Sequence, residues 1–168
     1  MEVRRIRDAI VIHNIPIPPS VNQLYKTLTI RNQIRRAPSK KYKDWQNQCR
    51  QMYLENAHKF RCMQVLVQQI LEELDCALEV RYYFFFHRDK IYCKDNTFKK
   101  MDVSNRIKAV EDMVFSVLDM DDRVTWKVIA EKIECPSDVQ ESVSVTLQPF
   151  HPRKKDTLLQ QINLGHKP

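Results

Sequence analysis

The chain has 168 residues, 43% of them hydrophobic, which is enough to bury the core of one domain but not of two. Its 28 Lys and Arg exceed its 21 Asp and Glu, and the net charge of +7 favours a polyanionic partner, with nucleic acid as the first expectation. The single glycine excludes the glycine-rich loops that bind nucleotide phosphates.

Cysteine content and hydropathy predict the compartment. No stretch approaches the roughly 18 consecutive apolar residues of a membrane span, and the N-terminus does not resemble an export signal. The cysteines are odd in number and lack zinc-binding spacing, so we expect reduced thiols in a cytoplasmic protein without a membrane partner. They are Cys49, Cys62, Cys76, Cys93 and Cys135.

The first predicted element is a strand over residues 3–17, where isoleucines alternate until Pro16 and the prolines after it end the strand. A loop follows. Its basic stretch is either a solvated loop or a phosphate contact, and the sequence leaves both interpretations open. The basic residues are Arg31, Arg35, Arg36, Lys40, Lys41 and Lys43.

Two helices and a strand are predicted next. Apolar residues at three- and four-residue spacing indicate an amphipathic helix over residues 39–59, capped by Ser39. Residues 65–75 predict a second, shorter helix, although its start is ambiguous with a strand. Residues 78–87 are rich in aromatics and predict a central strand buried on both faces, with the aromatics in the core and not on a base-stacking platform. Residues 88–100 predict a basic loop.

The charge anomaly of the chain lies in residues 102–122. This window has six acids and two bases, a net charge of −4, so the rest of the chain carries +11. Carboxylates repel phosphate, but a divalent cation resolves the conflict because carboxylate oxygens bind Mg²⁺, which then binds the scissile phosphate and activates water. The acids are Asp102, Glu111, Asp112, Asp119, Asp121 and Asp122.

Residues 104–118 have helical periodicity, with an apolar face for the core and Lys108 on the opposite, polar face. At 1.5 Å per residue the helix is about 20 Å long, so its two ends cannot share a metal along its own length. For Asp102 and Asp122 to converge, the chain after the helix must fold back beside it.

Two strands over residues 124–133 and 142–147 complete the predicted order, which indicates an α+β class: a single small domain with a mixed β-sheet and helices packed on it. We expect this domain to span residues 1–149. Residues 150–168 predict a basic, mobile C-terminal tail.

Each residue of the acidic window also has an ordinary structural interpretation, and only their combination in a basic chain favours catalysis. The structural alternatives are a helix N-cap for Asp102 or Ser104, an i,i+4 pair for Lys108 and Asp112, and turn positions for Asp121 and Asp122.

The acidic window resembles the D-x-D-N-x-x-K-x-x-x-D and D-D signature of RusA-type Holliday junction resolvases. The matching residues are Asp102-Val-Ser-Asn105-Arg-Ile-Lys108-Ala-Val-Glu-Asp112, followed by Asp121-Asp122. The earlier segment Pro18-Pro19-Ser20-Val21-Asn22 resembles that family's P-P-S-x-N segment, and the two matches occur in the family's order.

The resemblance implies a RusA-like fold and a homodimer that resolves four-way junctions or other branched DNA by paired symmetric nicks in recombination and repair, a role suited to a phage or mobile element. It implies Mg²⁺ as cofactor, with Mn²⁺ as a substitute. Asp102 and Asp122 would be metal ligands supported by Asp121, and Lys108 would stabilise negative charge on the phosphate or orient the nucleophile.

Further residues receive roles from the same resemblance. Asn105 and Asp112 would orient their neighbours. Lys99, Lys100 and Arg106 are expected to contact the DNA backbone. The sequence departs from the family at Ser104, where the pattern has a second aspartate: Ser104 still binds the metal, or Asp121 compensates, or activity is reduced.

Two other functions remain open. A non-catalytic protein that binds branched DNA would keep the fold and lack the chemistry, an alternative that Ser104 makes conceivable. An RNA-binding or small structural domain would show no preference for four-way over linear DNA.

Overall fold

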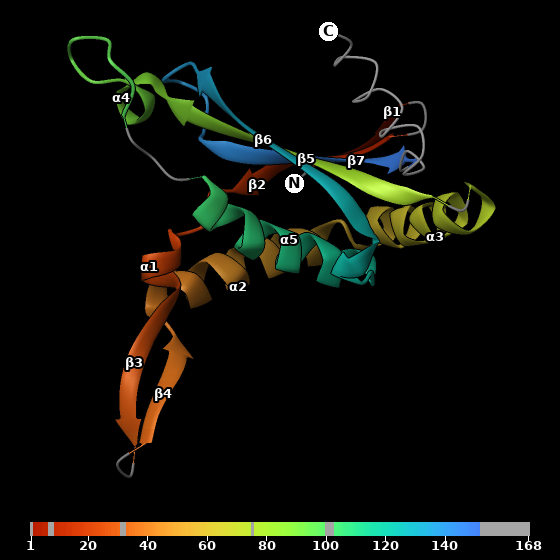
Figure 1. Cartoon of the computed structure of the whole chain (residues 1–168), viewed down its shortest axis with the longest axis horizontal. Helices are drawn as coiled ribbons and strands as arrows, with labels where there is room; N and C mark the ends of the chain where they lie inside the picture. The colour runs from red at the N-terminus through yellow and green to blue at the C-terminus, as the bar shows by residue number, and fades with distance from the viewer. Residues whose placement is uncertain (1, 7–8, 31–32, 75, 100–102, 152–168) are drawn as a thin grey trace, which may run out of the picture.

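A computed structural model of the chain describes residues 2–6, 9–30, 33–74, 76–99 and 103–151. A five-stranded sheet of order β1-β2-β7-β5-β6 forms the body, with β5 and β6 parallel and the other neighbours antiparallel. Helices α2, α3 and α5 pack on one face of this sheet, and a separate two-stranded sheet, β3–β4, projects away from it (Figure 1). The predicted class, a small α+β domain with a mixed sheet and helices packed on it, is confirmed.

In the described residues the strands are β1 (Glu2–Ile6), β2 (Ala9–Pro16), β3 (Tyr25–Ile30), β4 (Gln33–Pro38), β5 (Ala77–His87), β6 (Thr125–Cys135) and β7 (Ser142–Phe150). The helices are α1 (Val21–Leu24), α2 (Lys40–Glu55), α3 (Ala57–Leu74), α4 (Arg88–Ile91) and α5 (Ser104–Leu118), followed by a 3₁₀ turn, η1 (Asp122–Val124).

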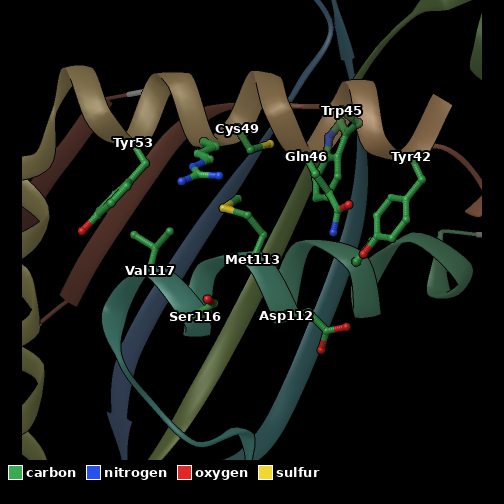
Figure 2. A pocket seen from close by; sticks show the side chains of 11 residues that line it. Tyr42, Trp45, Gln46, Cys49, Tyr53, Asp112, Met113, Ser116 and Val117 are labelled. Atoms are coloured by element: carbon green, nitrogen blue, oxygen red, sulfur yellow. The ribbon is translucent and has the colours of Figure 1, made fainter. Parts of the chain in front are cut away.

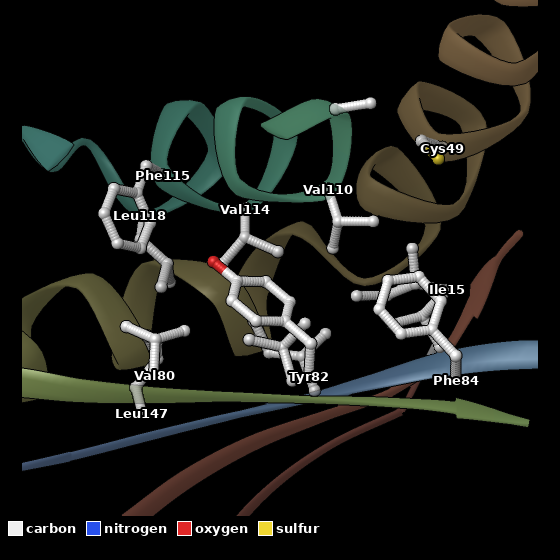
Figure 3. Packing of buried hydrophobic residues seen from close by; sticks show 14 of the residues in the cluster. Ile15, Cys49, Val80, Tyr82, Phe84, Val110, Val114, Phe115, Leu118 and Leu147 are labelled. Carbon is white, nitrogen blue, oxygen red and sulfur yellow. The ribbon is translucent and has the colours of Figure 1, made fainter. Parts of the chain in front are cut away.

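The core lies between β5 and the helices. Figure 3 shows Val80, Tyr82 and Phe84 pointing from β5 toward Val114 and its neighbours on α5. The three strand residues are at most 1% exposed. Burying one large apolar side chain contributes roughly 1.5–3 kcal/mol, so this layer fixes the position of α5 on the sheet.

The prediction that the β5 aromatics belong to the core is confirmed for alternate residues, but the prediction of burial on both faces is wrong. Tyr82, Phe84 and Phe86 are buried, whereas Arg81 and Phe85 are half-buried on the opposite face. Successive side chains of a strand point to opposite faces, and these helices cover only one of them (Figure 1).

Helix α5 connects the parallel strands β5 and β6, and the chain reverses at its C-terminal end. Asp119 takes the left-handed conformation there, with φ 53° and ψ 51°, and the amide of Met120 donates to the Phe115 carbonyl at 2.9 Å. Glycine usually fills this position, but Asp is among the few other residues that tolerate it. The reversal returns Asp121 and Asp122 alongside the helix.

Helix α2 begins as predicted. The Ser39 hydroxyl accepts a hydrogen bond from the Tyr42 amide at 3.1 Å, which caps the helix. The indole N–H of Trp45 donates to the buried Pro16 carbonyl at 2.9 Å and ties the helix to the end of β2.

Four predicted elements differ from the structure. The single opening strand is two antiparallel strands, β1 and β2. The basic loop after it is the helix α1 and the β3–β4 hairpin. The second helix, α3, starts at Ala57 and not at residue 65, and the buried Phe60 packs its polar first half against the core. The basic loop after β5 begins with the short helix α4.

Strand β7 continues to Phe150, one residue beyond the predicted domain end, and most of the predicted mobile tail lies outside the described residues. Within the part of the chain that the structure describes, no helix is long and apolar enough to cross a membrane. All five cysteines are described, and each is a free thiol.

Candidate active site

Lys108 is the centre of the candidate site. It lies in the second turn of α5, and its Nζ is 2.9 Å from Asp112 Oδ1, 2.9 Å from Asp122 Oδ2 and 3.6 Å from Glu111 Oε2. Asp112 and Glu111 are on the same helix, but Asp122 comes from η1, after the chain has reversed. The expected folding back is therefore present: an acid that follows the helix lies beside Lys108.

Lys108 and Asp122 hold each other in the charged form. Hydrogen bonds to Asp112 and then Asp122 raise the pKa of Lys108, so it remains an ammonium at neutral pH. The bond from Lys108 lowers the pKa of Asp122, which remains a carboxylate. The Lys108 and Asp122 side chains are 57% and 55% exposed, and ion pairs this exposed contribute little to stability. The arrangement orients charge more than it stabilises the fold.

A surface hollow of about 250 Å³ is lined by the three carboxylates that contact Lys108. Its lining residues are Glu111, Asp112, Phe115, Ser116, Met120 and Asp122. Three carboxylates around one ammonium leave an excess of two negative charges, and oxygen donors of this kind suit Mg²⁺. Among the described residues, however, no group of three or more His, Cys, Asp or Glu is placed to hold a metal ion.

Asp121 acts as a turn residue. Its Oδ1 accepts a hydrogen bond from the Arg123 amide at 2.9 Å and thereby caps η1. This geometry matches the structural alternative for Asp121, and its role as a metal ligand stays a prediction. Its side chain remains 58% exposed to solvent.

The other residues of the predicted metal site, Asp102 and Ser104, lie near the start of α5 in the sequence. Asp102 and Lys100 lie outside the described residues, as does the side chain of Asn105. Ser104 is the exposed first residue of α5, and Val103 occupies the N-cap position without a side-chain cap. Ser104 is therefore not the N-cap of this helix, and its role toward a metal stays a prediction.

Arg106 has a structural partner that the sequence did not indicate. Its guanidinium donates to the Pro18 carbonyl and lies 6.0 Å from the centre of the Phe86 ring. Burial lowers the pKa of Arg106. Because this guanidinium is directed into the protein, the predicted phosphate contact would require it to leave Pro18.

Lys99, the other described residue of the predicted DNA contacts, is exposed and donates to the Asp89 carbonyl at 2.5 Å. Its side chain thus closes the loop that starts at α4. Its contact with DNA stays a prediction.

A groove of about 370 Å³, which the sequence did not predict, lies between α2 and α5. Figure 2 shows Tyr42, Trp45 and Tyr53 of α2 facing Met113 and Asp112 of α5 across it. The three- and four-residue spacing of the α2 aromatics was the available signal, and it predicted a buried face. The groove reaches the site because Asp112 lies at its edge and contacts Lys108.

A second polar cluster, also missed, lies on the sheet face opposite the helices. Glu79 is 3% exposed, and its carboxylate accepts from Arg81 at 2.5 Å, Lys127 at 2.7 Å and Gln148 at 2.8 Å. The hydrogen bond from Lys127, more than that from Arg81, holds the pKa of Glu79 below its ordinary value. One acid within an aromatic strand was the sequence signal.

No protein-family model matches the chain, and no curated protein matches its sequence. The two segments that carry the resemblance nevertheless lie together, because Arg106 at the start of α5 bonds to Pro18 of the proline segment.

Proposed function

We propose that the chain is a magnesium-dependent, structure-specific endonuclease of the RusA type, which acts as a homodimer and cuts branched DNA by paired nicks. The observation that carries the proposal is the position of Lys108, an ammonium held between Asp112 of α5 and Asp122 of the returning chain. An exposed cation fixed at an acidic hollow suits a reaction in which negative charge develops on a phosphate.

The residues of the site would have three roles: binding the metal, stabilising charge on the phosphate, and orienting the ammonium. Asp122 and Asp121, together with Asp102 and Ser104, would hold Mg²⁺, which would supply a Lewis acid for the phosphate and lower the pKa of bound water. Lys108 stays protonated because of its carboxylate partners, so it acts as a charge stabiliser and not as a general base. Asp112 keeps the ammonium oriented through its 2.9 Å contact.

A second candidate is a non-catalytic protein that binds branched DNA. Ser104 favours it, because a neutral hydroxyl is a weaker Mg²⁺ ligand than the carboxylate of the family pattern. This candidate predicts tight binding of a four-way junction without nicking in either Mg²⁺ or Mn²⁺.

The decisive experiment measures nicking and binding of a synthetic four-way junction with Mg²⁺. Asp102→Asn and Asp122→Asn should abolish nicking and leave the gel-shift affinity within about threefold, since each removes one charge from the site and none from the basic surface. Asp138→Asn, at an exposed position in the turn before β7, is the matched control and should cut like the unmodified chain.

Three results would contradict the proposal. Nicking by Asp102→Asn at the unmodified rate would remove the metal assignment. Binding without any nicking, in Mg²⁺ and Mn²⁺ alike, would favour the non-catalytic candidate. Equal affinity for four-way and linear DNA in competition would exclude recognition of branched structure.

A further inference from the structure

The β3–β4 hairpin is a separate structural unit that the site does not use. Its six register pairs run from Tyr25↔Pro38 to Ile30↔Gln33, and in Figure 1 it extends beyond the helix layer, away from the main sheet. Its base is fixed, because the Ser39 amide donates to the Leu24 carbonyl at 2.8 Å. The hairpin is thus a projecting arm on a rigid base.

The described side chains of this arm are mostly exposed on both faces. Ile34 is 78% exposed and Tyr25 is 47% exposed, at opposite ends of the arm. An isolated two-stranded hairpin is at best marginally stable in water, and exposed apolar residues add no stability there. A partner that covers the arm would stabilise it.

The arm lies within a segment that carries all of the excess positive charge. Residues 9–43 contain seven of the 28 Lys and Arg and none of the 21 Asp and Glu, so the rest of the chain has 21 of each sign. In the arm, Arg35 pairs with Leu28 and Arg36 with Thr27, which places the two arginines on opposite faces. Lys26 shares a face with Arg35.

The positive charge continues where a helix disfavours it. Lys40, Lys41 and Lys43 occupy the start of α2, and its first turn has no acidic residue. The N-terminal end of a helix is the positive end of its dipole, so lysines there reduce helix stability. Local preferences are broken in this way mainly where a function requires it, and here the requirement would be an anionic partner.

We propose that the β3–β4 arm binds duplex DNA by entering a groove of the double helix, with Lys26, Arg35 and Arg36 contacting phosphates. The major groove of B-DNA admits a two-stranded β-ribbon and has a phosphate strand on each side. A ribbon that enters edge first has a phosphate strand opposite each of its faces, so cations on both faces match that shape, whereas a flat anionic membrane would contact one face only.

The arm and α5, which carries the candidate site, lie on the same side of the main sheet (Figure 1). The arm proposal therefore deepens the proposed function, and it rests on that function. The ring of Tyr25, at the arm base, contacts Tyr42 of α2 at 5.8 Å between centroids. Tyr42 and Asp112 line one groove, and Asp112 contacts Lys108. A duplex held by the arm would therefore approach the acidic hollow.

The test compares two triple variants of equal charge change. The arm variant is Lys26→Ala/Arg35→Ala/Arg36→Ala. The control removes three exposed cations elsewhere, Lys59→Ala/Arg61→Ala on α3 and Lys132→Ala on β6. Binding of a short linear duplex is measured by fluorescence anisotropy at salt concentrations from about 50 to 200 mM, where phosphate contacts dominate the salt dependence. Circular dichroism is used to check that both variants fold.

The arm variant should lower the slope of log K against log salt by about 0.9 for each lost contact, hence by roughly two to three units, and weaken binding more than tenfold at the lowest salt. The control should retain most of its slope. Equal losses in the two variants, or no loss in either, would overturn the arm proposal, as would unchanged DNA affinity with a loss of dimer in sedimentation.

The two proposals fail separately. Loss of duplex affinity in the arm variant, with no junction nicking by the unmodified chain, would support the arm and reject the nuclease. Normal nicking by the unmodified chain, with an arm variant that binds like the control, would support the nuclease and reject the arm.

Discussion

Replacing Glu79 with glutamine tests the polar cluster on the face of the sheet opposite the helices. The change keeps the side-chain shape and removes one negative charge from between Arg81 and Lys127. The Glu79 side chain is 4% exposed, whereas those of Arg81 and Lys127 are 35% and 46% exposed. Breaking a fully buried ion pair costs about 3–5 kcal/mol, but these two cations regain water, so we expect a loss of about 2 kcal/mol.

That loss corresponds to a decrease in Tm of roughly 4–8 °C for a domain of this size, measured by thermal unfolding at pH 7. Glu131→Gln is the control, because Glu131 is an exposed carboxylate on the adjacent strand β6, and it should change stability by less than about 0.5 kcal/mol. Equal unfolding temperatures for the two variants would refute the argument.

The pH dependence gives an independent check. The pKa of Glu79 is lowered in the folded chain from its ordinary value of 4.5, chiefly by the hydrogen bond from Lys127. The unfolded chain therefore binds the proton first as pH falls, so the stabilisation is complete above 4.5 and is lost as pH falls through the lower, folded pKa. The difference between the unmodified chain and Glu79→Gln should shrink in acid, and a difference that grows there would contradict the assignment.

Two further predictions concern the site and its support. Lys108→Met should raise the pKa of Asp122, because the hydrogen bond from Lys108 is the main cause of its lowered pKa. The same change should slow junction nicking by roughly 100-fold or more. Carboxyl NMR titration and the nicking rate measure the two effects, and an unchanged Asp122 titration would show that the 2.9 Å contact does not persist in solution. Trp45→Phe removes the buried hydrogen bond to the Pro16 carbonyl and should cost about 1–3 kcal/mol in urea unfolding, whereas a cost near zero would mean that another donor replaces the indole.

Elements with a strong local pattern were predictable from the sequence. Helix α2 combines a capping serine with aromatics at helical spacing, and α5 has a continuous apolar face, so local geometry determined both. In β5, strand geometry places Tyr82 and Phe84, two residues apart, on the same buried face. Strand geometry did not determine how many faces of the sheet are covered by helices. That number depends on where α3 and α5 pack, which no local pattern contains.

The hairpin arm was not predictable for a related reason. Strand periodicity is visible when one face is buried, and β3–β4 is exposed on both faces, so its hydrophobic pattern is weak. Thr27, Thr29 and Ile34 favour strands, yet the preceding prolines and the nearby arginines indicated a loop. The hairpin was missed because its side chains are exposed on both faces, and not because its residues disfavour strands.

One part of the candidate site, the contact between Lys108 and Asp122, was predictable because it depends on a single turn of the chain after α5. The meeting of Lys108 and Asp122 required only that the chain reverse after α5, and Asp119 makes that reversal. The bond from Arg106 to Pro18 joins residues 88 positions apart, and the sequence had suggested a phosphate contact for Arg106 instead. Long-range partners of this kind decide which cations remain available to DNA.

The distribution of charge connects the two proposals. The acidic hollow beside Lys108 repels phosphate, and residues 9–43 carry the whole of the excess positive charge. Under the proposed function, the arm would hold the duplex through phosphate contacts while a divalent cation neutralises the hollow, so affinity would follow the arm and cutting would follow the metal. This separation reduces the repulsion between the carboxylates of the hollow and the DNA phosphates, because most of the phosphate contacts would lie away from the hollow.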